Sequence, residues 1–442
     1  MRTLPKLTRA IPPLFGACAA IGLILLGCSV AAGQGSTTEP PPLVLAEYQV
    51  WHGLPCHQQP PPPYDSRDPG TIARHINAAK ARGIDGFVID WYGPKAGVAN
   101  DAEREFMDQA TAEVMRQSPA QGFNAGLMYD EGTLKQSGVP TSTYTALMIA
   151  DLLYASQQYF TSTAYLRLNG HPALFIFPYA DVDAYIDWPR VKSALPAELS
   201  IIFLGPNLDS QSHPKENDTL FDGFYAWVQP GHYPWSADGT DWGEDYLRWF
   251  YETMKGTFPY SDKIMVGGVW PGFDDSEACW GSNRYMWPRC GQTWRDTWAL
   301  ANQYHASVVM IDTWNDFDED TAVEYGTGDC LVPASLQVAL PGRTALYTHT
   351  VINTGKYADI FHLAATSQHQ WPTTQSLTEV TLGRHASATL AVSLTVPSSA
   401  VIGIHDQLVV TATSSLSPTV QSQVDDLLIV GQGLYLPLLL RR

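Results

Sequence analysis

The sequence is poor in charged residues and especially poor in basic ones. Lys and Arg together number 26 among 442 residues, against 44 Asp and Glu, so the formal net charge is −18 at pH 7. A protein that binds nucleic acid needs a basic surface to neutralise phosphates, so this balance argues against a nucleic-acid partner. A neutral or cationic ligand is easier to accommodate.

Several motifs that carry chemistry are also missing. The chain contains no Gly-rich phosphate loop, no GxSxG nucleophile elbow and no HExxH metal motif. No CxxC pair or HxxxH spacing supports a zinc site, and the acidic run DFDED does not fit the spacing of an EF-hand. The sequence therefore indicates neither a cofactor nor a metal.

No apolar run is long enough to span a membrane comfortably. The longest, residues 11–26, is interrupted by Gly and follows three basic residues, which is the pattern of a cleaved export signal. Its end, LLGC, resembles a bacterial lipobox in which Cys28 would be lipidated; ordinary cleavage near residues 30–32 is the alternative. We expect an exported protein at the cell surface or outside the cell, held at the membrane only by this lipid.

Cysteines are few, and they suit an oxidising compartment. Cys18 leaves with the signal and Cys28 would carry lipid. An even number then remains, which favours disulfides. A pair between residues 279 and 290 would close a short loop, and a pair between 56 and 330 would join the ends of the main domain, but three pairings stay open. The four residues concerned are Cys56, Cys279, Cys290 and Cys330.

The remaining chain divides by composition. Residues 29–42 form a Pro-, Ser- and Gly-rich linker. Residues 43–330 alternate short apolar runs with helical segments, and eight such runs in this length predict an α/β fold, the (β/α)₈ TIM barrel. The expected strands are residues 43–51, 86–91, 124–129, 173–177, 200–204, 223–228, 264–270 and 307–314. The expected helices are residues 71–82, 102–117, 143–160, 244–255 and 293–304.

The character changes after residue 330. Helical periodicity stops, and Thr/Val/Ser-rich runs alternate with turns such as NTG, which predicts an all-β immunoglobulin-like sandwich over residues 331–430. It carries no evident catalytic cluster, so we expect an accessory domain. The tail, residues 431–442, is apolar, too short to span a bilayer and of unknown role.

The stretch TWNDFDEDTAVE, Thr313 to Glu324, follows the last expected strand and is the leading candidate for chemistry. Functional groups of such barrels lie at the C-terminal ends of strands. Glycoside hydrolysis needs two carboxyl groups and aromatic faces for sugar rings, and here Asp316 and Glu319 stand three residues apart beside an aromatic pair. A solvated acidic turn or a calcium loop is the alternative.

This stretch resembles the NEWHEGTxIE signature of glycoside hydrolase family 99, the endo-α-mannosidases, and of related family 71-like enzymes. Other segments resemble the family in the same order: EYQVWHG, GIDGFVIDWYGP, YLRLNGHPALFIF, FDGFYAW and VWPGFDDS. The resemblance implies a hydrolase of α-linked glycans that acts with retention. Asp316 stands at the position of the base, which deprotonates the substrate's own 2-hydroxyl, and Glu319 at that of the general acid.

One departure from the family bears directly on activity. Asp316 is one methylene shorter than the Glu of the family, and a misplacement of about 1 Å can cost roughly 10²-fold in rate. Asp318 and Asp320 also replace a His and a Gly. A second hypothesis is therefore a surface glycan-binding protein, weakly active or inactive, on the same barrel.

Further residues are candidates for contacts with the substrate, since they lie at expected strand ends or match the signature. Structural roles stay open for them, such as capping, turn formation and hydrogen bonding. We expect an oligosaccharide or polysaccharide as the partner and a monomeric chain. The candidates are Trp51, His52, Asp90, Trp91, Tyr92, Asp130, Glu131, Trp270, Asp274, Trp314 and Glu324.

Overall fold

The computed structural model describes residues 40–58, 60, 62–205, 215–228, 241–256, 259–281, 283–355 and 357–431. The elements below all belong to one compact unit that begins at residue 41. The expected export signal, the lipobox ending at Cys28 and nearly all of the apolar tail lie outside the described residues. Among the helices that are described, none is both long and apolar enough to cross a bilayer.

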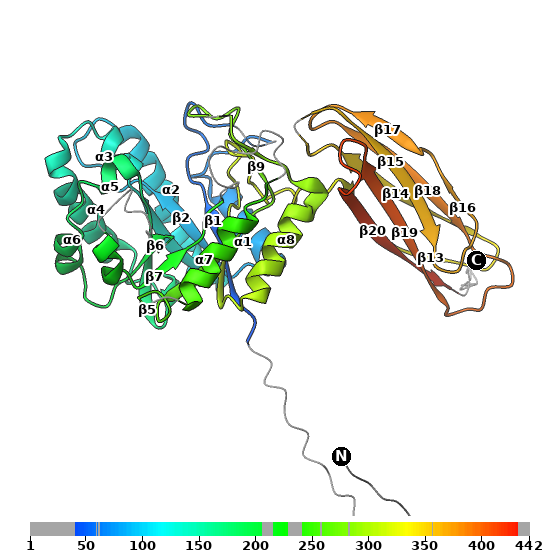
Figure 1. Ribbon diagram of the computed structural model, residues 1–442, viewed down its shortest axis with the longest axis horizontal. Helices are drawn as coiled ribbons and strands as arrows, with labels where there is room; N and C mark the ends of the chain where they lie inside the picture. The colour runs from blue at the N-terminus through cyan, green and yellow to red at the C-terminus, as the bar shows by residue number, and fades with distance from the viewer. Residues whose placement is uncertain are drawn as a thin grey trace, which may run out of the picture. The chain divides into compact units, whose positions relative to one another are not determined.

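Eight parallel strands of the described chain close into a barrel (Figure 1). Each strand pairs with its neighbours in the order β3-β2-β1-β11-β8-β7-β6-β5, and pairing of β3 with β5 closes the ring. All eight strands expected from the sequence are present, which confirms the barrel. Their bounds are β1 Leu43–Tyr48, β2 Gly86–Trp91, β3 Asn124–Asp130, β5 His171–Phe177, β6 Ser200–Leu204, β7 Gly223–Tyr225, β8 Ile264–Val269 and β11 Val308–Ile311.

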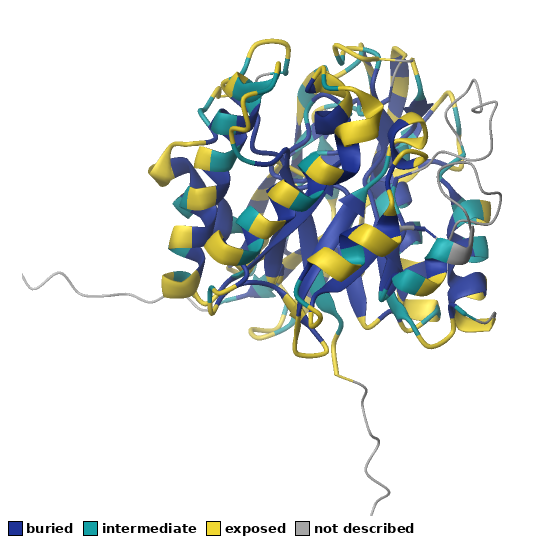
Figure 2. Cartoon of the chain, turned by 90° about the vertical axis from the view of Figure 1, so that its left-hand side faces the viewer, coloured by how far each residue is buried: buried dark blue, intermediate teal, exposed yellow. Residues whose placement is uncertain are grey.

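Helices cover the outside of the barrel with their buried faces inward and their exposed faces outward (Figure 2). The first begins where Asp68 caps it, since the side chain accepts a hydrogen bond from the Thr71 backbone N–H at 2.7 Å and Pro69 occupies the first turn. The helices are α1 Pro69–Ala81, α2 Asp101–Gln121, α3 Gly132–Gln136, α4 Tyr144–Gln158, α5 Ala180–Asp183, α6 Trp188–Ala194, α7 Glu244–Gly256 and α8 Gln292–Gln303.

Short elements extend this framework. Strand β4 (Arg167–Leu168) adds to β5, and β9 (Phe273–Asp274) pairs with β10 (Tyr285–Met286) as a separate antiparallel pair. Three 3₁₀ helices are described as well: η1 Thr141–Thr143, η2 Lys215–Leu220 and η3 Arg289–Gly291. These short elements were not expected from the sequence, because runs of two to six residues carry almost no periodicity.

The barrel interior changes character along the strands. One layer is an apolar cluster that includes Leu45, Val88 and Met310. Side chains alternate along a strand, so the residue two positions further on also faces inward. At these later positions stand acids: Glu47 on β1, Asp90 on β2, Asp130 on β3 and Asp312 after β11. The interior is therefore acidic near the C-terminal ends of the strands and apolar in the layer that precedes these acids along the strands.

Two β-sheets follow the barrel and share one apolar core, which confirms the expected sandwich. Burial alternates along β14 and β20, so every second side chain enters the core. One sheet consists of β12 Leu331–Val332, β14 Thr344–Ile352, β18 Ser387–Thr395 and β16 Thr373–Gln375. The other consists of β13 Leu336–Ala339, β20 Gln421–Val430, β19 His405–Ser414, β15 Asp359–Ser367 and β17 Glu379–Leu382.

The four cysteines that were expected to form disulfides do so, although not in the pairs that their positions suggested. Cys56 is bonded to Cys279, and Cys290 to Cys330. The suggested 279–290 and 56–330 pairs rested on distance along the chain. The fold instead places the loop after β1 against the segment between β9 and β10, which the sequence does not reveal.

Candidate active site

A cavity of about 400 Å³ opens at the C-terminal ends of the barrel strands. Carboxyl groups and aromatic rings dominate its walls, and no Lys or Arg is among the described residues that line it. Those residues are Glu47, Gln49, Trp51, Pro55, Cys56, His57, Asp90, Tyr92, Glu103, Met128, Asp130, Gln136, Phe177, Tyr179, Trp227, Trp280, Asp316 and Glu319.

The loop after β11 carries both predicted catalytic carboxyls, and it is fixed to itself and to β1. The Val323 backbone N–H donates to the Thr313 carbonyl at 3.1 Å, which closes the loop across its base. Asn315 binds both the N–H and the carbonyl of Gln49, at 2.8 and 2.9 Å. The loop is therefore held in register with the first strand, and both Asp316 and Glu319 line the cavity.

Asp316 is almost fully buried, at 2% exposure. Its Oδ1 accepts hydrogen bonds from the backbone N–H groups of Asp318 and Glu319, at 2.9 and 3.0 Å. Burial, the nearby Glu319 carboxyl and Asp318 raise the Asp316 pKa well above its ordinary value, although these two hydrogen bonds oppose the shift. A carboxylate of raised pKa is a stronger base once ionised.

Glu319 is partly open to the cavity, with 14% of its side chain exposed. Burial raises its pKa to about 7, and Arg284, whose Nη2 lies 3.5 Å from Oε1, opposes that shift. A pKa near neutrality leaves much of the carboxyl protonated at neutral pH, as a general acid requires. The loop is held here too, since the Asp274 backbone N–H donates to the Glu319 carbonyl at 2.8 Å.

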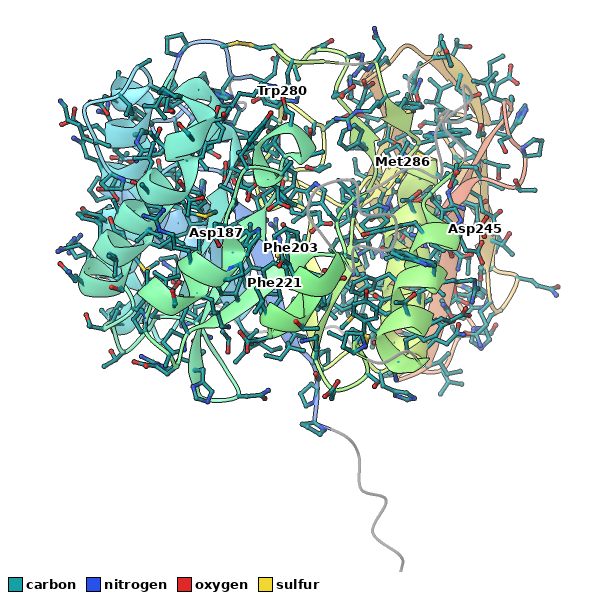
Figure 3. The ribbon with its side chains drawn as sticks, turned by 60° about the vertical axis from the view of Figure 1, so that its left-hand side comes forward. Asp187, Phe203, Phe221, Asp245, Trp280 and Met286 are labelled. Carbon is teal, nitrogen blue, oxygen red and sulfur yellow. A yellow bond between two sulfur atoms is a disulfide. The ribbon has the colours of Figure 1, made fainter. Side chains whose placement is uncertain are left out.

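Aromatic rings form one side of the cavity near its mouth. Trp51 stacks on His57 with ring centroids 4.5 Å apart, and Trp280 meets Trp51 edge-on at 5.9 Å. Figure 3 shows Trp280 at the end of the barrel away from the start of β1. The Cys56–Cys279 disulfide ties together the two segments that carry His57 and Trp280. Flat aromatic faces of this kind suit the apolar faces of sugar rings.

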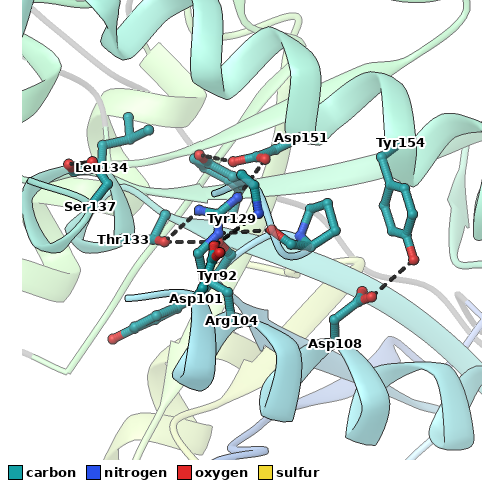
Figure 4. Close-up of polar contacts among 12 residues, drawn as sticks. Tyr92, Asp101, Arg104, Asp108, Tyr129, Thr133, Leu134, Ser137, Asp151 and Tyr154 are labelled. Atoms are coloured by element: carbon teal, nitrogen blue, oxygen red, sulfur yellow. Dashed lines mark hydrogen bonds and ion pairs between the residues drawn. The ribbon is translucent and has the colours of Figure 1, made fainter. Parts of the chain in front are cut away.

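A buried ion pair lies among the segments that follow β2 and β3 (Figure 4). Arg104, fully buried on α2, contacts Asp151 at 2.6 Å, and Tyr129 donates to the same carboxylate at 2.8 Å. Arg104 also donates to the Thr133 hydroxyl, which in turn donates to the Tyr92 carbonyl. The network thereby joins the chain just after β2 to the chain just after β3, where Tyr92 and Asp130 enter the cavity.

The floor of the cavity is acidic. Glu47 is 1% exposed, and neither of its carboxylate oxygens has a hydrogen-bond partner among the described residues. Burial and the charge of Asp90, with smaller effects from Asp316 and Asp312, raise the Glu47 pKa well above its usual range. Burial likewise raises the pKa of Asp130 to about 7. Several carboxyl groups therefore share a small volume without a basic partner among the described lining residues.

Six residues predicted from the sequence line the cavity. They are Trp51, Asp90, Tyr92, Asp130, Asp316 and Glu319. All of them follow barrel strands or end them, which is where a barrel places its functional groups. Their roles in substrate binding and catalysis remain predictions.

The structure corrects the prediction for five other residues, which are buried in the packing outside the cavity. Trp91 points out of the barrel and donates to Asp108 at 2.9 Å, because it is the neighbour of the inward Asp90. Trp270 donates to the Trp242 carbonyl at 3.1 Å. His52 contacts the Asn315 carbonyl at 2.8 Å, and burial lowers its pKa to about 4. Glu131 accepts the Tyr179 backbone N–H, and Trp314 packs near Phe87.

Two predicted acids also lie outside the cavity, each with a cationic or polar partner. Asp274 forms an ion pair with Arg384 at 2.8 Å. Glu324 accepts from Tyr64 at 3.0 Å and lies 3.1 Å from His75. These contacts fit the structural roles that the sequence left open for both acids, in which acids in turns and loops stabilise the fold.

Sequence reasoning missed most of the remaining lining. Glu47 and Gln49 could have been found, because they share the inward face of β1 with Trp51 under the two-residue alternation of a strand. His57 and Trp280 lie on irregular segments without periodicity. Among the described residues, no group of three His, Cys, Asp or Glu side chains is arranged to hold a metal ion.

The chain is similar to known proteins in two respects, a family model that matches its C-terminal sandwich and solved structures that cover 64% of the chain. Residues 332–429 match the family model of the VWA7 Ig-like domain. No curated protein matches the chain. The GH99 endo-α-mannosidase from Bacteroides thetaiotaomicron is 18% identical in a complex with BIS-TRIS-propane, with a TM-score of 0.49 over 64% of this chain and 86% of that chain.

Two further solved structures are similar in fold to this chain. Another structure of the Bacteroides thetaiotaomicron enzyme is 17% identical, with a TM-score of 0.49 over 64% of this chain and 87% of that one. A glycoside hydrolase-like protein is 15% identical, with a TM-score of 0.46 over the same shares. At these identities the likeness is one of fold alone.

Proposed function

We propose that this protein is a glycoside hydrolase that cleaves an external polysaccharide or glycan. The observation that carries the proposal is that Asp316 and Glu319 face one cavity, where the pKa of Glu319 is about 7. Aromatic faces beside the two carboxyls provide surfaces for sugar rings. The resemblance of the sequence to family 99 supports an α-linked substrate and net retention, and the N-terminal pattern supports action outside the cell.

In this proposal Glu319 is the general acid. Its proton passes to the glycosidic oxygen as the bond from that oxygen to the anomeric carbon breaks. Asp316 takes the proton from the sugar's own 2-hydroxyl as that oxygen bonds to the anomeric carbon. A water then opens the anhydrosugar, giving one proton to Glu319 while Asp316 returns its proton to the 2-oxygen, so the configuration is retained. If a water attacks directly instead, Asp316 takes its proton and the configuration inverts. Asp316 Oδ1 is held by two backbone N–H groups, so Oδ2, whose one described contact is Gln49 at 3.5 Å, is the oxygen that serves as base.

The test compares Glu319→Gln with wild type on a panel of α-mannans and α-glucans, with products separated by chromatography. Loss of a general acid lowers the rate by about 10² to 10⁴-fold while binding survives. Glu198→Gln, at an exposed position outside the cavity, is the matched control. A Glu319→Gln variant that cleaves as fast as the control would contradict the proposal.

A second function is favoured by one observation, the shorter Asp316 at the position of the family's Glu. On this hypothesis the protein binds glycans at its surface without turnover. Binding of an oligosaccharide by the wild type, with no product from any substrate on the panel, would support it.

A further inference from the structure

Several hydrogen-bond acceptors at the floor of the cavity are buried without a described partner. Both oxygens of Glu47, Oδ1 of Asp90 and Oε1 of Gln49 are buried and lack a hydrogen-bond partner among the described residues. All three side chains line the cavity, and Glu47 and Asp90 are 1% and 3% exposed. A buried acceptor without a donor costs free energy, and a buried carboxylate costs more. A ligand that enters this cavity must therefore supply donors at its floor.

The charge of the cavity narrows the choice of ligand. Six carboxyl groups line it, and although Arg284 lies 3.5 Å from Glu319, the described lining includes no Lys or Arg beside Glu47 or Asp90. A field of one sign in an apolar enclosure concentrates ligands of the opposite charge and repels those of the same charge. Sugars that carry a carboxylate, sulfate or phosphate are thus disfavoured at this site.

The ligand could present either a hydroxyl or an amine to the floor of the cavity, and these two groups differ in how they form hydrogen bonds. A hydroxyl offers one donor and itself accepts hydrogen bonds, whereas an ammonium offers three donors and accepts none. The ammonium matches Glu47 and Asp90 better, because two carboxyl groups on adjacent strands, with buried oxygens that lack a described partner, can accept its hydrogen bonds and balance its charge when they ionise. The rings of Tyr92, Phe177 and Trp227 line the same cavity, and aromatic faces also attract cations.

We propose that the sugar unit bound at the floor carries a free protonated amine, a de-N-acetylated hexosamine, whose ammonium group is held by Glu47 and Asp90. This inference deepens the proposed function and rests on it for the sugar. It makes Glu47 and Asp90 residues that determine specificity. Glu47 stands on β1 and Asp90 on the adjacent β2, so both carboxyls face the barrel interior from neighbouring strands.

The raised pKa of Glu47 supplies an independent signature. Burial and the neighbouring charges of Asp90, Asp316, Asp312 and Glu319 raise this pKa. An ammonium beside it favours the ionised form, so binding of the amine expels a proton. A neutral sugar has no such effect.

The experiment measures binding of the methyl α-glycosides of glucosamine and mannosamine by calorimetry at pH 6, beside those of glucose, mannose and the N-acetylated sugars. Charged hydrogen bonds predict an affinity about 10- to 100-fold higher for the amines. Titration in buffers of different ionisation enthalpy is expected to show proton release with the amines alone. Glu47→Gln and Asp90→Asn should each reduce the preference at least tenfold, while Asp245→Asn, exposed on α7 (Figure 3), keeps it.

Each outcome bears on one proposal or the other. Equal affinity for amine and hydroxyl sugars would overturn the inference, even if neutral glycans are cleaved and the hydrolase function stands. Amine preference without cleavage of any polysaccharide would leave the inference standing and count against the hydrolase. Calcium that binds more tightly than the amines at the same carboxyls would overturn it in favour of a metal.

Melting curves of both variants show whether they fold, and we expect Glu47→Gln to melt no lower than wild type, because it removes an unpaired buried carboxyl.

Discussion

The side chain of Asn315 pairs with the backbone of Gln49 in both directions. Its Oδ1 accepts the Gln49 N–H at 2.8 Å, and its Nδ2 donates to the Gln49 carbonyl at 2.9 Å. The two residues are 266 positions apart in the chain, and Asp316 follows Asn315 directly. This amide side chain therefore helps to fix the proposed base relative to the first strand, together with the Trp314 backbone N–H, which donates to the Glu47 carbonyl at 2.7 Å.

Replacing Asn315 by Ala should lower activity more than its effect on stability explains. Two buried backbone groups lose their partners, at about 1 to 3 kcal/mol each, and Asp316 loses its register, so we expect kcat/KM to fall about 10²-fold. Asn353→Ala is the matched control, since Asn353 donates to two backbone carbonyls in the sandwich, at 2.9 Å each. Similar losses of kcat/KM in both variants, measured well below melting, would rule out a positioning role.

The pH dependence of kcat/KM should show a descending limb near pH 7. The general acid acts only when protonated, and burial raises the Glu319 pKa to about 7, so the rate falls as pH rises through that value. At lower pH the rate falls as well, because the base Asp316, whose pKa is also raised, becomes protonated. Because several carboxyl groups in the cavity interact, the apparent pKa of the descending limb belongs to the interacting groups together rather than to Glu319 alone. Residual activity of Glu319→Gln should lack the limb; a limb unchanged in that variant would assign it to another group.

Removing Asp151 should destabilise the barrel strongly. The Asp151→Ala change leaves the Arg104 guanidinium buried without its counter-charge, which costs about 3 to 5 kcal/mol in the free energy of unfolding. The pair of the half-buried Glu113 with the exposed Arg116 offers a comparison, and Glu113→Ala is expected to cost less than about 1 kcal/mol. Denaturant unfolding of both variants gives the two values, and equal losses would contradict this account.

The sandwich should lose stability as pH rises above neutrality. His349 and Asp426 are fully buried, with Nε2 and Oδ2 3.1 Å apart. Burial lowers the His349 pKa, but Asp426 outweighs it and the net shift is upward. The folded pKa lies above the unfolded one, so the stabilisation is complete below about pH 6.5 and disappears as pH rises through the folded value. Melting temperatures of wild type and Asp426→Asn should therefore converge from pH 6 to 8.5; a constant gap would contradict the linkage.

The sequence by itself determined the architecture, because strand and helix patterns are local. Each of the eight barrel strands shows as a short apolar run, and the loss of helical periodicity after residue 330 marks the sandwich. The Asp316–Glu319 segment could be found for the same reason, since barrel enzymes place their chemistry where strands end.

Only the tertiary structure decided which polar groups meet. Asp90 and Trp91 are neighbours in the sequence, and both are candidates there for contact with the substrate. The pleat of the strand nevertheless directs Asp90 into the barrel and Trp91 outward to Asp108. The pairing of Cys56 with Cys279 and the isolation of Glu47 among other acids depend on contacts between segments far apart in the chain. Such contacts follow from how strands and loops pack in space, which a local pattern of residues does not encode.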